Sequence, residues 1–407
     1  MAEKKTVRDI EVSGKRVLVR VDFNVPFKPG TDEISNANRI VASLPTIRYL
    51  LGRRASVVLC SHLGRPRGRS IPELSLRPIR GRLAQYLDMR ISFSESTDFR
   101  RIQEDVSRIT PGEVILLENM RFHPGEETNA PEFSKELSDL AEFYVNDAFG
   151  ASHRAHASIQ GITGFLPSVA GLLLEEEIRS LEKVLLDPLR PFVAVLGGAK
   201  VSEKINVVNN LSLTADKILI GGGMAATFLN STGIFVGSSP VEENFLEKAK
   251  KLLNNSPNTN VEIVLPVDVV VSAEFDSQSP YRTCPVSEIG EREMLLDIGP
   301  QTRDMYAKVL SDSSTVLWNG PMGVFEWDHY SEGTRLIASS IARDGIVSVI
   351  GGGSTVDAVS KFGLEARMTH ISTGGGASLE FMEGKDLPGI VSLLDADESY
   401  EKGVSGL

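Results

Sequence analysis

The feature that most constrains the fold of this chain is an alternation of short apolar, β-branched runs with longer segments of helical periodicity. In the first half, the apolar runs lie at residues 16–21, 56–60, 114–117 and 143–145. The helical patterns between them lie at residues 38–51, 78–87 and 131–141. The second half repeats the alternation, with apolar runs at residues 192–196, 217–220, 263–266, 267–271, 315–318, 346–350 and 370–372. Strands that alternate with helices form parallel sheets covered on both faces, so an α/β fold is predicted.

The length of 407 residues exceeds what one ordinary hydrophobic core supports, so two domains are expected. Residues 171–186 carry an apolar stripe at helical spacing, and Pro188 ends the pattern. A helix between two α/β halves is a candidate interdomain connector. A plain surface helix of either domain would show the same pattern.

Composition narrows the class of protein. The formal net charge of −11 argues against nucleic acid and anionic membranes as partners. Cys60 and Cys284 match no metal or redox spacing, which favours a reduced protein in the cytoplasm. The first ten residues are charged and do not resemble a signal peptide, and no uninterrupted apolar run could span a bilayer.

Polar side chains follow the predicted strands of the first half. These residues are Asp22, Asn24, His62, Arg65, Arg121, His153, Arg154 and His156. Ligands of open α/β sheets bind outside the carboxyl ends of the strands, so the arginines and histidines are expected to gather at one edge. Arginine offers a planar fork suited to carboxylate and phosphate. A small, multiply anionic ligand is predicted, whereas separate surface charges remain the alternative.

Glycine-rich turns follow five strands of the second half. They are Gly197–Gly198, Gly221–Gly223, Gly320–Gly323, Gly351–Gly353 and Gly374–Gly376. Glycine lets backbone amides approach a ligand closely, which is what a nucleotide with its phosphates needs.

The first of these turns also carries two lysines. After the apolar run, Lys200 and Lys204 are four residues apart, and Ser202 is a candidate helix N-cap. On a helix the two lysines would share one face beside an anion-binding turn. An ordinary turn with two solvated lysines is the alternative, and the stretch is not a Walker A loop.

A second alternative is a nicotinamide dehydrogenase. Gly221, Gly223 and Ala226 fit the loose dinucleotide fingerprint. The acid that should end a second strand falls at Glu242 or Glu243, where the pattern indicates a helix start instead. A kinase is therefore favoured over a dehydrogenase.

Eight segments together resemble one known family. They are VRVDFNVP (19–26), SHLGRP (61–66), ENMRFHPGEE (118–127), VNDAFGASHRAHAS (145–158), LGGAKVSEK (196–204), LIGGGMA (219–225), WNGPMGVFE (318–326) and STGGGASLE (372–380). In this order they closely resemble phosphoglycerate kinase over nearly the whole chain. The compact length and the HLGRP and GGGST variants suggest its archaeal branch.

The resemblance implies two Rossmann-like three-layer α/β/α domains with parallel sheets, joined by an interdomain helix and a hinge. The N-terminal domain would span residues 1–170, the interdomain helix 171–186 and the C-terminal domain 187–387, with the tail 388–407 packing back on the N-terminal domain. The implied activity is reversible, in-line phosphoryl transfer between 1,3-bisphosphoglycerate and ADP in a closed cleft, giving 3-phosphoglycerate and ATP in glycolysis and gluconeogenesis. The acceptor would be a carboxyl group, and Mg²⁺ would enter as Mg-ATP or Mg-ADP. The partners would be these small molecules, with a monomer or homodimer as the assembly.

The resemblance also assigns site residues. The catalytic residues would be Arg39 and Lys200. Phosphoglycerate would be bound by Asp22, Asn24, Arg39, His62, Leu63, Gly64, Arg65, Arg121 and Arg154. The nucleotide would be bound by Lys204, Gly221, Gly222, Gly223, Asn319, Pro321, Gly323, Val324, Glu326, Gly352, Gly353, Ser354 and Thr355. A phosphoryl-transfer or hinge loop would consist of Thr373, Gly374, Gly375 and Gly376.

One position departs from the family pattern. Many members have a metal-binding aspartate where this chain has Ser354, and serine is a weaker ligand for a hard cation. Either nucleotide phosphates and water hold the metal, or a carboxylate such as Asp357 helps, and no protein metal ligand is assigned. Ser354 also leaves open a catalytically silent nucleotide-binding paralogue, and a scaffold protein could reuse the fold.

Overall fold

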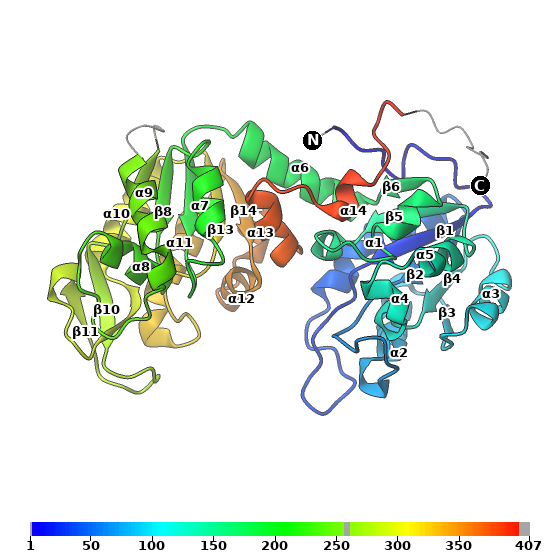
Figure 1. Ribbon diagram of the computed structural model, residues 1–407, viewed down its shortest axis with the longest axis horizontal. Helices are drawn as coiled ribbons and strands as arrows, with labels where there is room; N and C mark the ends of the chain where they lie inside the picture. Colours follow the sequence, from blue (N-terminus) through cyan, green and yellow to red (C-terminus); the bar gives the residue numbers. More distant parts are fainter. Residues whose placement is uncertain (1, 256–260, 399–407) are drawn as a thin grey trace. The chain divides into compact units, whose positions relative to one another are not determined.

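A computed structural model describes residues 2–255 and 261–398 of the chain (Figure 1). The chain divides into two compact units. Unit 1 comprises Met1–Ile178 and Asp386–Leu407, and unit 2 comprises Arg179–Lys385. The boundary lies within helix α6 (Leu172–Leu186), the helix expected at 171–186. Among the described residues, no helix has both the length and the apolar character needed to cross a membrane.

Unit 1 is built on a six-stranded parallel sheet with the strand order β3-β4-β2-β1-β5-β6. Its strands are β1 (Arg16–Val21), β2 (Ser56–Cys60), β3 (Ile91–Ser94), β4 (Val114–Leu117), β5 (Phe143–Asp147) and β6 (Ser168–Ala170). Its helices, besides the start of α6, are α1 (Asn38–Gly52), α2 (Arg77–Leu87), α3 (Phe99–Ser107), α4 (Pro124–Glu127), α5 (Pro131–Ser138) and α14 (Pro388–Val391).

Strand β1 shows why this sheet is buried on both faces. Val17, Val19 and Val21 pack with Ile40 and Ile47 of α1 in one hydrophobic cluster. Successive strand side chains point to opposite faces, so Leu18 and Arg20 lie on the other face, and both are also fully buried. A strand buried on both sides reads as a continuous apolar run, which explains why the sequence pattern located it. Arg20 is the exception in that run.

The described part of the C-terminal segment packs on unit 1. The backbone N–H of Leu394 donates to Ser168 O at 3.0 Å, and Lys5 N–H donates to Leu394 O at 2.9 Å. Asn146 Nδ2 donates to Gly389 O at 2.7 Å. Residues 399–407 of the expected tail lie outside the described residues.

Unit 2 contains a second six-stranded parallel sheet, with the strand order β15-β14-β13-β7-β8-β9. Its strands are β7 (Phe192–Leu196), β8 (Lys217–Ile220), β9 (Glu262–Val264), β13 (Thr315–Asn319), β14 (Val347–Gly351) and β15 (His370–Ile371). Its helices are α7 (Ile205–Leu211), α8 (Met224–Ser231), α9 (Leu246–Asn255), α10 (Pro300–Ser311), α11 (Glu332–Ile341), α12 (Gly353–Lys361) and α13 (Gly376–Met382). All five glycine-rich turns follow strands of this sheet, so parallel pairing brings them to one edge. Two parallel α/β units confirm the predicted fold class.

The alternation did not predict a second sheet in unit 2. Strands β10 (Asp268–Ser272), β11 (Tyr281–Pro285) and β12 (Met294–Ile298) form an antiparallel sheet with the order β11-β10-β12. The apolar run predicted at residues 267–271 corresponds to β10, but the pattern located neither β11 nor β12. The reason is that β11 has exposed side chains except at Cys284, so it lacks the apolar run of a buried strand.

Candidate functional site

In unit 1, polar side chains from the ends of β1 and β2 meet in one group. Asp22 and Asn24 follow β1, and His62 follows β2, as expected from the sequence. The backbone N–H of Gly64 donates to Asn24 Oδ1 at 3.0 Å, which ties the two strand ends together. His62 and Asp22 are both buried. We call the group Asp22, Asn24, Arg39, His62, Arg121 and Arg154 the anion site.

Arg39 at the start of α1 reaches this group. Its Nη1 lies 3.0 Å from Asp22 Oδ2 and donates to Asn24 O at 3.0 Å. The side chain is 31% exposed, so it lies between the buried strand ends and solvent. Among the described residues only Nη1 is engaged, which leaves Nε and Nη2 as donors for a ligand.

Arg121 is the residue of the anion site that most clearly indicates a bound ligand. It lies in the 3-10 helix η2 (Met120–Phe122) after β4 and is only 3% exposed. Nη1 donates to Gly64 O at 2.6 Å and Nε lies 3.5 Å from Glu127 Oε1, but Nη2 has no hydrogen-bond partner among the described residues. Burial, followed by the charge of Arg154, lowers its pKa to about 10. A buried guanidinium with an unused donor indicates a site for an anion.

Two histidines near this site, His62 and His156, have lowered pKa values. Burial lowers the pKa of His62 well below its usual value, and burial lowers that of His156 to about 4. His62 Nδ1 lies 3.9 Å from Asp22 Oδ1, which would be an ion pair only for a protonated ring. We favour the neutral form because 3.9 Å is too long for a hydrogen bond and cationic side chains surround the ring.

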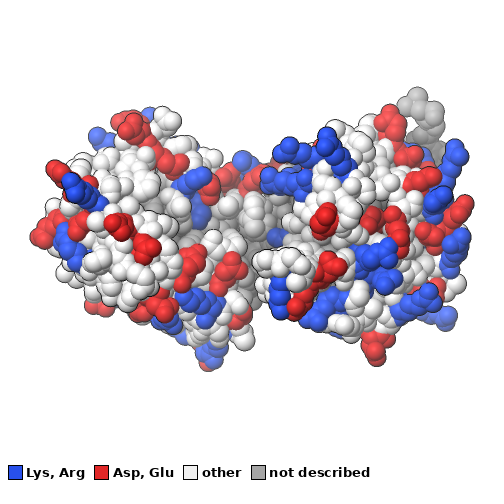
Figure 2. Space-filling model, turned by 90° about the horizontal axis from the view of Figure 1, so that it is seen from below, with Lys and Arg blue, Asp and Glu red and all other residues white. Residues whose placement is uncertain are grey.

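The remaining residues expected at this site differ in exposure. Leu63 is buried, and its backbone N–H donates to Asn119 Oδ1 at 3.3 Å. Gly64 adopts φ +60, a conformation that favours glycine. Arg154 is half-buried, whereas Arg65 is exposed. The sequence therefore located the edge correctly, and exposure separates an inner arginine, Arg121, from an outer one, Arg65. Acidic and basic side chains are interspersed on the face drawn in Figure 2.

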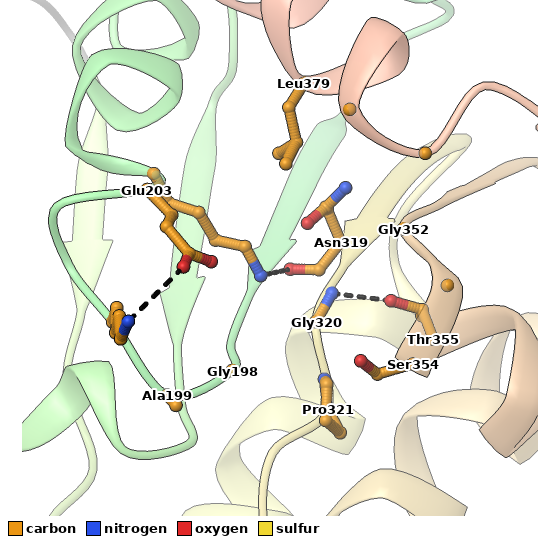
Figure 3. A pocket seen from close by; sticks show the side chains of 15 residues that line it. Gly198, Ala199, Glu203, Asn319, Gly320, Pro321, Gly352, Ser354, Thr355 and Leu379 are labelled. Carbon is orange, nitrogen blue, oxygen red and sulfur yellow. Dashed lines mark hydrogen bonds and ion pairs between the residues drawn. The ribbon is translucent and has the colours of Figure 1, made fainter. Parts of the chain in front are cut away.

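In unit 2, the glycine turns surround a pocket of about 340 Å³ (Figure 3). Its lining comprises Gly198, Ala199, Lys200, Glu203, Lys204, Asn319, Gly320, Pro321, Gly352, Gly353, Ser354, Thr355, Gly375, Gly376 and Leu379. These residues follow β7, β13, β14 and β15, which are neighbours in the sheet. The pattern of glycine turns thus predicted the correct edge.

The two lysines of this pocket do not share a helix face, so that prediction was wrong. Helix α7 begins at Ile205, and Ser202 is not its cap; its backbone N–H donates to Glu242 Oε2 at 2.9 Å. Lys204 is buried, and its Nζ donates to Gly197 O at 2.5 Å and to Asn319 O at 3.1 Å. The side chain of Lys200 is 64% exposed, with its Nζ 3.9 Å from Glu203 Oε1. The difference arises because two carbonyl groups at the strand ends require a buried donor, which draws Lys204 inward.

Lys204 remains able to carry charge in this position. Burial lowers its pKa to about 8, with the charge of Glu203 acting in the opposite direction. Near neutral pH most of the ammonium therefore stays protonated. Lys204 lines the pocket, and its ammonium joins the turns after β7 and β13. Figure 3 draws the bond that the carbonyl of Asn319 accepts.

Asn319 at the end of β13 and Thr355 in α12 form another part of the pocket lining. Thr355 Oγ1 accepts the backbone N–H of Gly320 at 2.7 Å, which joins the turn after β13 to the start of α12. Asn319 is buried, and its Nδ2 has no hydrogen-bond partner among the described residues. A buried amide donor lining a pocket without a partner points to a ligand.

Several residues expected at the nucleotide site lie outside this pocket. They are Gly221, Gly222, Gly223, Gly323, Val324 and Glu326. Of the expected phosphoryl-transfer or hinge loop, Gly375 and Gly376 line the pocket, whereas Thr373 and Gly374 do not. The turn after β8 packs on protein, because a Cβ on Gly222 would meet Gly198 N at 2.5 Å and Pro321 O at 2.7 Å. Glu326 is exposed, and its carbonyl accepts Lys361 Nζ at 3.1 Å.

Sequence reasoning missed five lining residues as site residues: Gly198, Ala199, Glu203, Gly320 and Leu379. The first four lie inside motifs that were identified, so their neighbours could have indicated them. Leu379 lies on α13, where an apolar residue reads as core.

The pocket does not contain a metal site of its own. The described residues hold no group of three or more His, Cys, Asp or Glu side chains that could bind a metal. Glu203 is the one carboxylate in the lining given above, and Lys200 lies beside it. Ser354 lines the pocket, whereas Asp357 is exposed and does not. A lining with one carboxylate and the hydroxyl of Ser354 fits a cation held mainly by the phosphates of a bound nucleotide.

The dehydrogenase alternative finds no support in this geometry. Glu242 precedes the 3-10 helix η5 (Glu243–Phe245) rather than ending a strand. Its carboxylate accepts the Ser202 backbone N–H at 2.9 Å. Burial raises the pKa of Glu242, but hydrogen bonds from the Ser202 side chain and backbone outweigh burial and lower it.

Comparison with known proteins identifies the family. The family model described as Phosphoglycerate kinase matches residues 7–385. The chain is 49% identical to a phosphoglycerate kinase of Chlorobium phaeovibrioides, over 97% of this chain and 100% of that protein. It is 48% identical to one of Moorella thermoacetica, over 96% of this chain and 99% of that protein.

Solved structures agree with these relatives. The chain is similar to the structure of phosphoglycerate kinase from Coxiella burnetii, with 38% identity, a TM-score of 0.87 and coverage of 96% of this chain and 98% of that one. It is also similar to the crystal structure of phosphoglycerate kinase from Pyrococcus horikoshii OT3, with 32% identity, a TM-score of 0.83 and coverage of 97% and 98%.

Two expectations from the sequence can now be assessed. The affinity to an archaeal branch is not supported, because the relatives at 48–49% identity are bacterial. The relatives likewise give no support to a catalytically silent paralogue. The family model and these relatives cover almost the entire sequence, and the chain belongs to the phosphoglycerate kinase family.

Proposed function

We propose that this chain transfers a phosphoryl group reversibly between 1,3-bisphosphoglycerate and ADP, giving 3-phosphoglycerate and ATP. The acceptor in the reverse direction is the carboxylate of 3-phosphoglycerate. The anion site of unit 1 binds the phosphoglycerate, and the glycine-lined pocket of unit 2 binds the nucleotide phosphates. The observation that carries the assignment is that each site presents a buried donor with no hydrogen-bond partner in the described part of the chain, Arg121 Nη2 in unit 1 and Asn319 Nδ2 in unit 2.

The chemistry requires positioned cations rather than a base. A carboxylate nucleophile is already ionised near neutral pH, because its pKa is about 4 or below. The transition state spreads negative charge over three oxygens, so electrostatic stabilisation is the main catalytic requirement. Arg39 and Lys200 take this role, since both carry charge that is only partly neutralised by one carboxylate each.

The remaining site residues bind the substrates or hold other parts of the two sites in position. Asp22 holds Arg39, and Asn24 holds the Gly64 turn. Lys204 and Thr355 keep the pocket turns together while their neighbours contact phosphate. Backbone amides at the start of α12, next to Gly352 and Gly353, suit the same anion.

The two sites lie in different units, so they must come together for transfer. Closure excludes water, which would otherwise hydrolyse the acyl phosphate or ATP. The loop Thr373–Gly376 leads into α13, whose first residue is Gly376, and α6 contains the unit boundary, so both are suited to such a movement. The proposal therefore includes hinge closure and in-line transfer.

Mg²⁺ completes the proposal as part of Mg-ATP or Mg-ADP. When bound, the cation neutralises charge on the phosphates. Ser354 offers one neutral hydroxyl oxygen toward it, at the second residue of α12.

A change at Ser354 tests this arrangement of the metal. Ser354→Asp is expected to lower the Mg²⁺ concentration that gives half-maximal turnover by about tenfold, because a carboxylate is a stronger ligand for a hard cation. Ser354→Asn is the neutral control of equal size and should leave the Mg²⁺ requirement within about twofold of the original. The measurement is a Mg²⁺ titration at saturating substrates, and an unchanged requirement in the aspartate variant would place the metal away from Ser354.

The proposed location of the protein is the cytoplasm. Both cysteines are buried and unpaired, which agrees with the reducing cytoplasm. The proposed partners are the small-molecule substrates, with a monomer or homodimer as the assembly.

Calorimetry with each substrate alone tests the assignment of the two sites. Arg154→Gln is expected to weaken 3-phosphoglycerate binding at least about tenfold and leave ADP binding unchanged, because a charge-assisted hydrogen bond is lost. Asn319→Asp replaces the free amide donor by oxygen and should have the opposite pattern. Arg108→Gln, at an exposed ion pair on the surface, is the matched control for arginine removal. The assignment fails if both substrates respond to the same variant.

A further inference from the structure

Arg20 is a fully buried arginine that the proposed reaction does not use. It lies on β1 between Val19 and Val21, on the sheet face opposite the cluster that packs against α1. An arginine is always charged, and burial of a charge is costly unless hydrogen bonds and a counter-charge compensate it. The contacts of Arg20 must therefore compensate the cost of burying its charge.

A chain of buried contacts holds the guanidinium in place. Arg20 Nε donates to Ser158 Oγ at 2.9 Å, and Nη1 donates to Val21 O at 2.5 Å. Ser158 Oγ donates in turn to Glu126 Oε1 at 2.6 Å, and Ser158 N–H donates to Glu126 Oε2 at 2.9 Å. Glu126 is fully buried and accepts at both oxygens, so it provides the counter-charge through Ser158.

The other end of the guanidinium faces His62. Arg20 Nη2 lies 3.1 Å from His62 Nδ1, and both residues are buried. A guanidinium has five N–H donors and no acceptor, so Nδ1 must present its lone pair. The ring proton of neutral His62 is then on Nε2, for which the described residues provide no hydrogen-bond partner.

The alternative protonation does not fit this contact. A proton on Nδ1 would place two N–H groups against each other at 3.1 Å. Asp22 Oδ1, at 3.9 Å from Nδ1, is too far away to compensate. The contact between Arg20 Nη2 and His62 Nδ1 therefore requires a neutral ring whose proton is on Nε2.

We propose that Arg20, held by Glu126 through Ser158, is a positioning residue that fixes His62 as the neutral Nε2–H tautomer, so that His62 offers one N–H donor to phosphoglycerate. This inference rests on the proposed function of the anion site. His62 then recognises an anion without adding a charge of its own. Its contribution to binding does not change with pH across the neutral range.

The charged groups around His62 all act in the same direction. Arg20 comes from β1, Arg39 from α1, Arg121 from η2 and Arg154 from the segment after β5. Burial and these four cations lower the pKa of His62 well below its usual value, and Asp22 is the carboxylate that opposes them at 3.9 Å. The electrostatics therefore agree with the hydrogen-bond geometry.

Nuclear magnetic resonance of the full chain with ¹⁵N-labelled histidine tests the proposal directly. The chain has six histidines, and a His62→Gln sample assigns the His62 signals. We expect an unprotonated Nδ1 and a protonated Nε2 at pH 7, with no titration of His62 between about pH 5.5 and 8.5. An Nδ1–H tautomer or an imidazolium at pH 7 would overturn the proposal. The measurement needs no substrate, so it succeeds or fails separately from the kinase assignment.

A paired variant tests the role of Arg20. Arg20→Met with Glu126→Gln removes both charges, because removing one alone would leave a buried unpaired charge. Nδ1 of His62 then no longer faces an obligatory donor, so the nitrogen signals are expected to show a mixture of the Nδ1–H and Nε2–H tautomers at pH 7.

The kinetic readout is the ratio of the variant KM for 3-phosphoglycerate to the original KM at each pH, since titration of the substrate cancels. This ratio should be at least about threefold at pH 7, because part of the His62 population no longer offers an Nε2–H donor to the anion. A ratio within about twofold of one, with His62 still in the Nε2–H form, would show that Arg20 does not position His62. If the paired variant does not fold, the spectrum of the original protein still decides the proposal.

Discussion

Arg39→Ala is expected to lower kcat by about a thousandfold while changing the affinity for each substrate by no more than about threefold. Arg39 lies at the outer edge of the anion site and uses only Nη1 for protein contacts, to Asp22 and Asn24. In the proposed reaction its free donors would face charge that develops during transfer, whereas buried Arg121 and half-buried Arg154 would bind the ground state. Loss of an interaction made mainly in the transition state reduces turnover more than binding.

Steady-state kinetics with both substrates varied, together with calorimetry, measures this split. Arg48→Ala is the matched control, because Arg48 lies on the same helix and donates to Tyr86 O at 2.9 Å, away from the anion site. It should retain turnover within about twofold, as surface changes usually do. A large loss of 3-phosphoglycerate affinity with normal turnover would contradict the role given to Arg39.

Lys200→Ala is expected to reduce kcat by at least about a hundredfold, because a positioned cation beside the transferred group is lost. The side chain is largely exposed and pairs loosely with Glu203 at 3.9 Å, so its removal should not destabilise the fold measurably. The combination of full stability with lost turnover distinguishes Lys200 from Lys204. Buried Lys204 holds two strand-end carbonyls, so its replacement would disturb the pocket itself.

Thermal unfolding and steady-state kinetics on the same samples check this expectation. Lys308→Ala, at an exposed lysine of α10, is the control for loss of a surface ammonium group in unit 2. Normal turnover in Lys200→Ala would remove Lys200 from the mechanism. A large fall in unfolding temperature would instead indicate a structural role.

The sequence was sufficient to place most of the site because of how parallel sheets are built. Buried strands such as β1 and β7 read as continuous apolar runs, and their ends are clear where polar or glycine residues begin. Pairing in parallel then brings those ends to one edge. The positions of Asp22, His62 and the pocket glycines follow from this rule.

Other features depend on tertiary contacts that leave no periodic signal. The inward orientation of Lys204 is determined by carbonyl groups of β7 and β13, which are more than a hundred residues apart. The turn after β8 looks like a nucleotide loop in sequence, but Gly222 is packed against Gly198. Arg20 sits in an apolar strand pattern, and its role emerges only when Ser158 and Glu126 are seen beside it.

The short and exposed strands were also beyond pattern reasoning. Strand β6 has three residues, and β11 exposes most of its side chains, so neither has the apolar run of a buried strand. Such strands are defined by the neighbours they pair with, β5 and β10.

The most direct test of the central claim is a coupled assay of the purified protein with ATP, Mg²⁺ and 3-phosphoglycerate that reports formation of 1,3-bisphosphoglycerate. Omission of Mg²⁺ and the Lys200→Ala variant are run beside it. The expected result is turnover that requires the metal and collapses in the variant. Absence of turnover in a folded sample that still binds ATP by calorimetry would contradict the assignment, and would direct attention to Ser354.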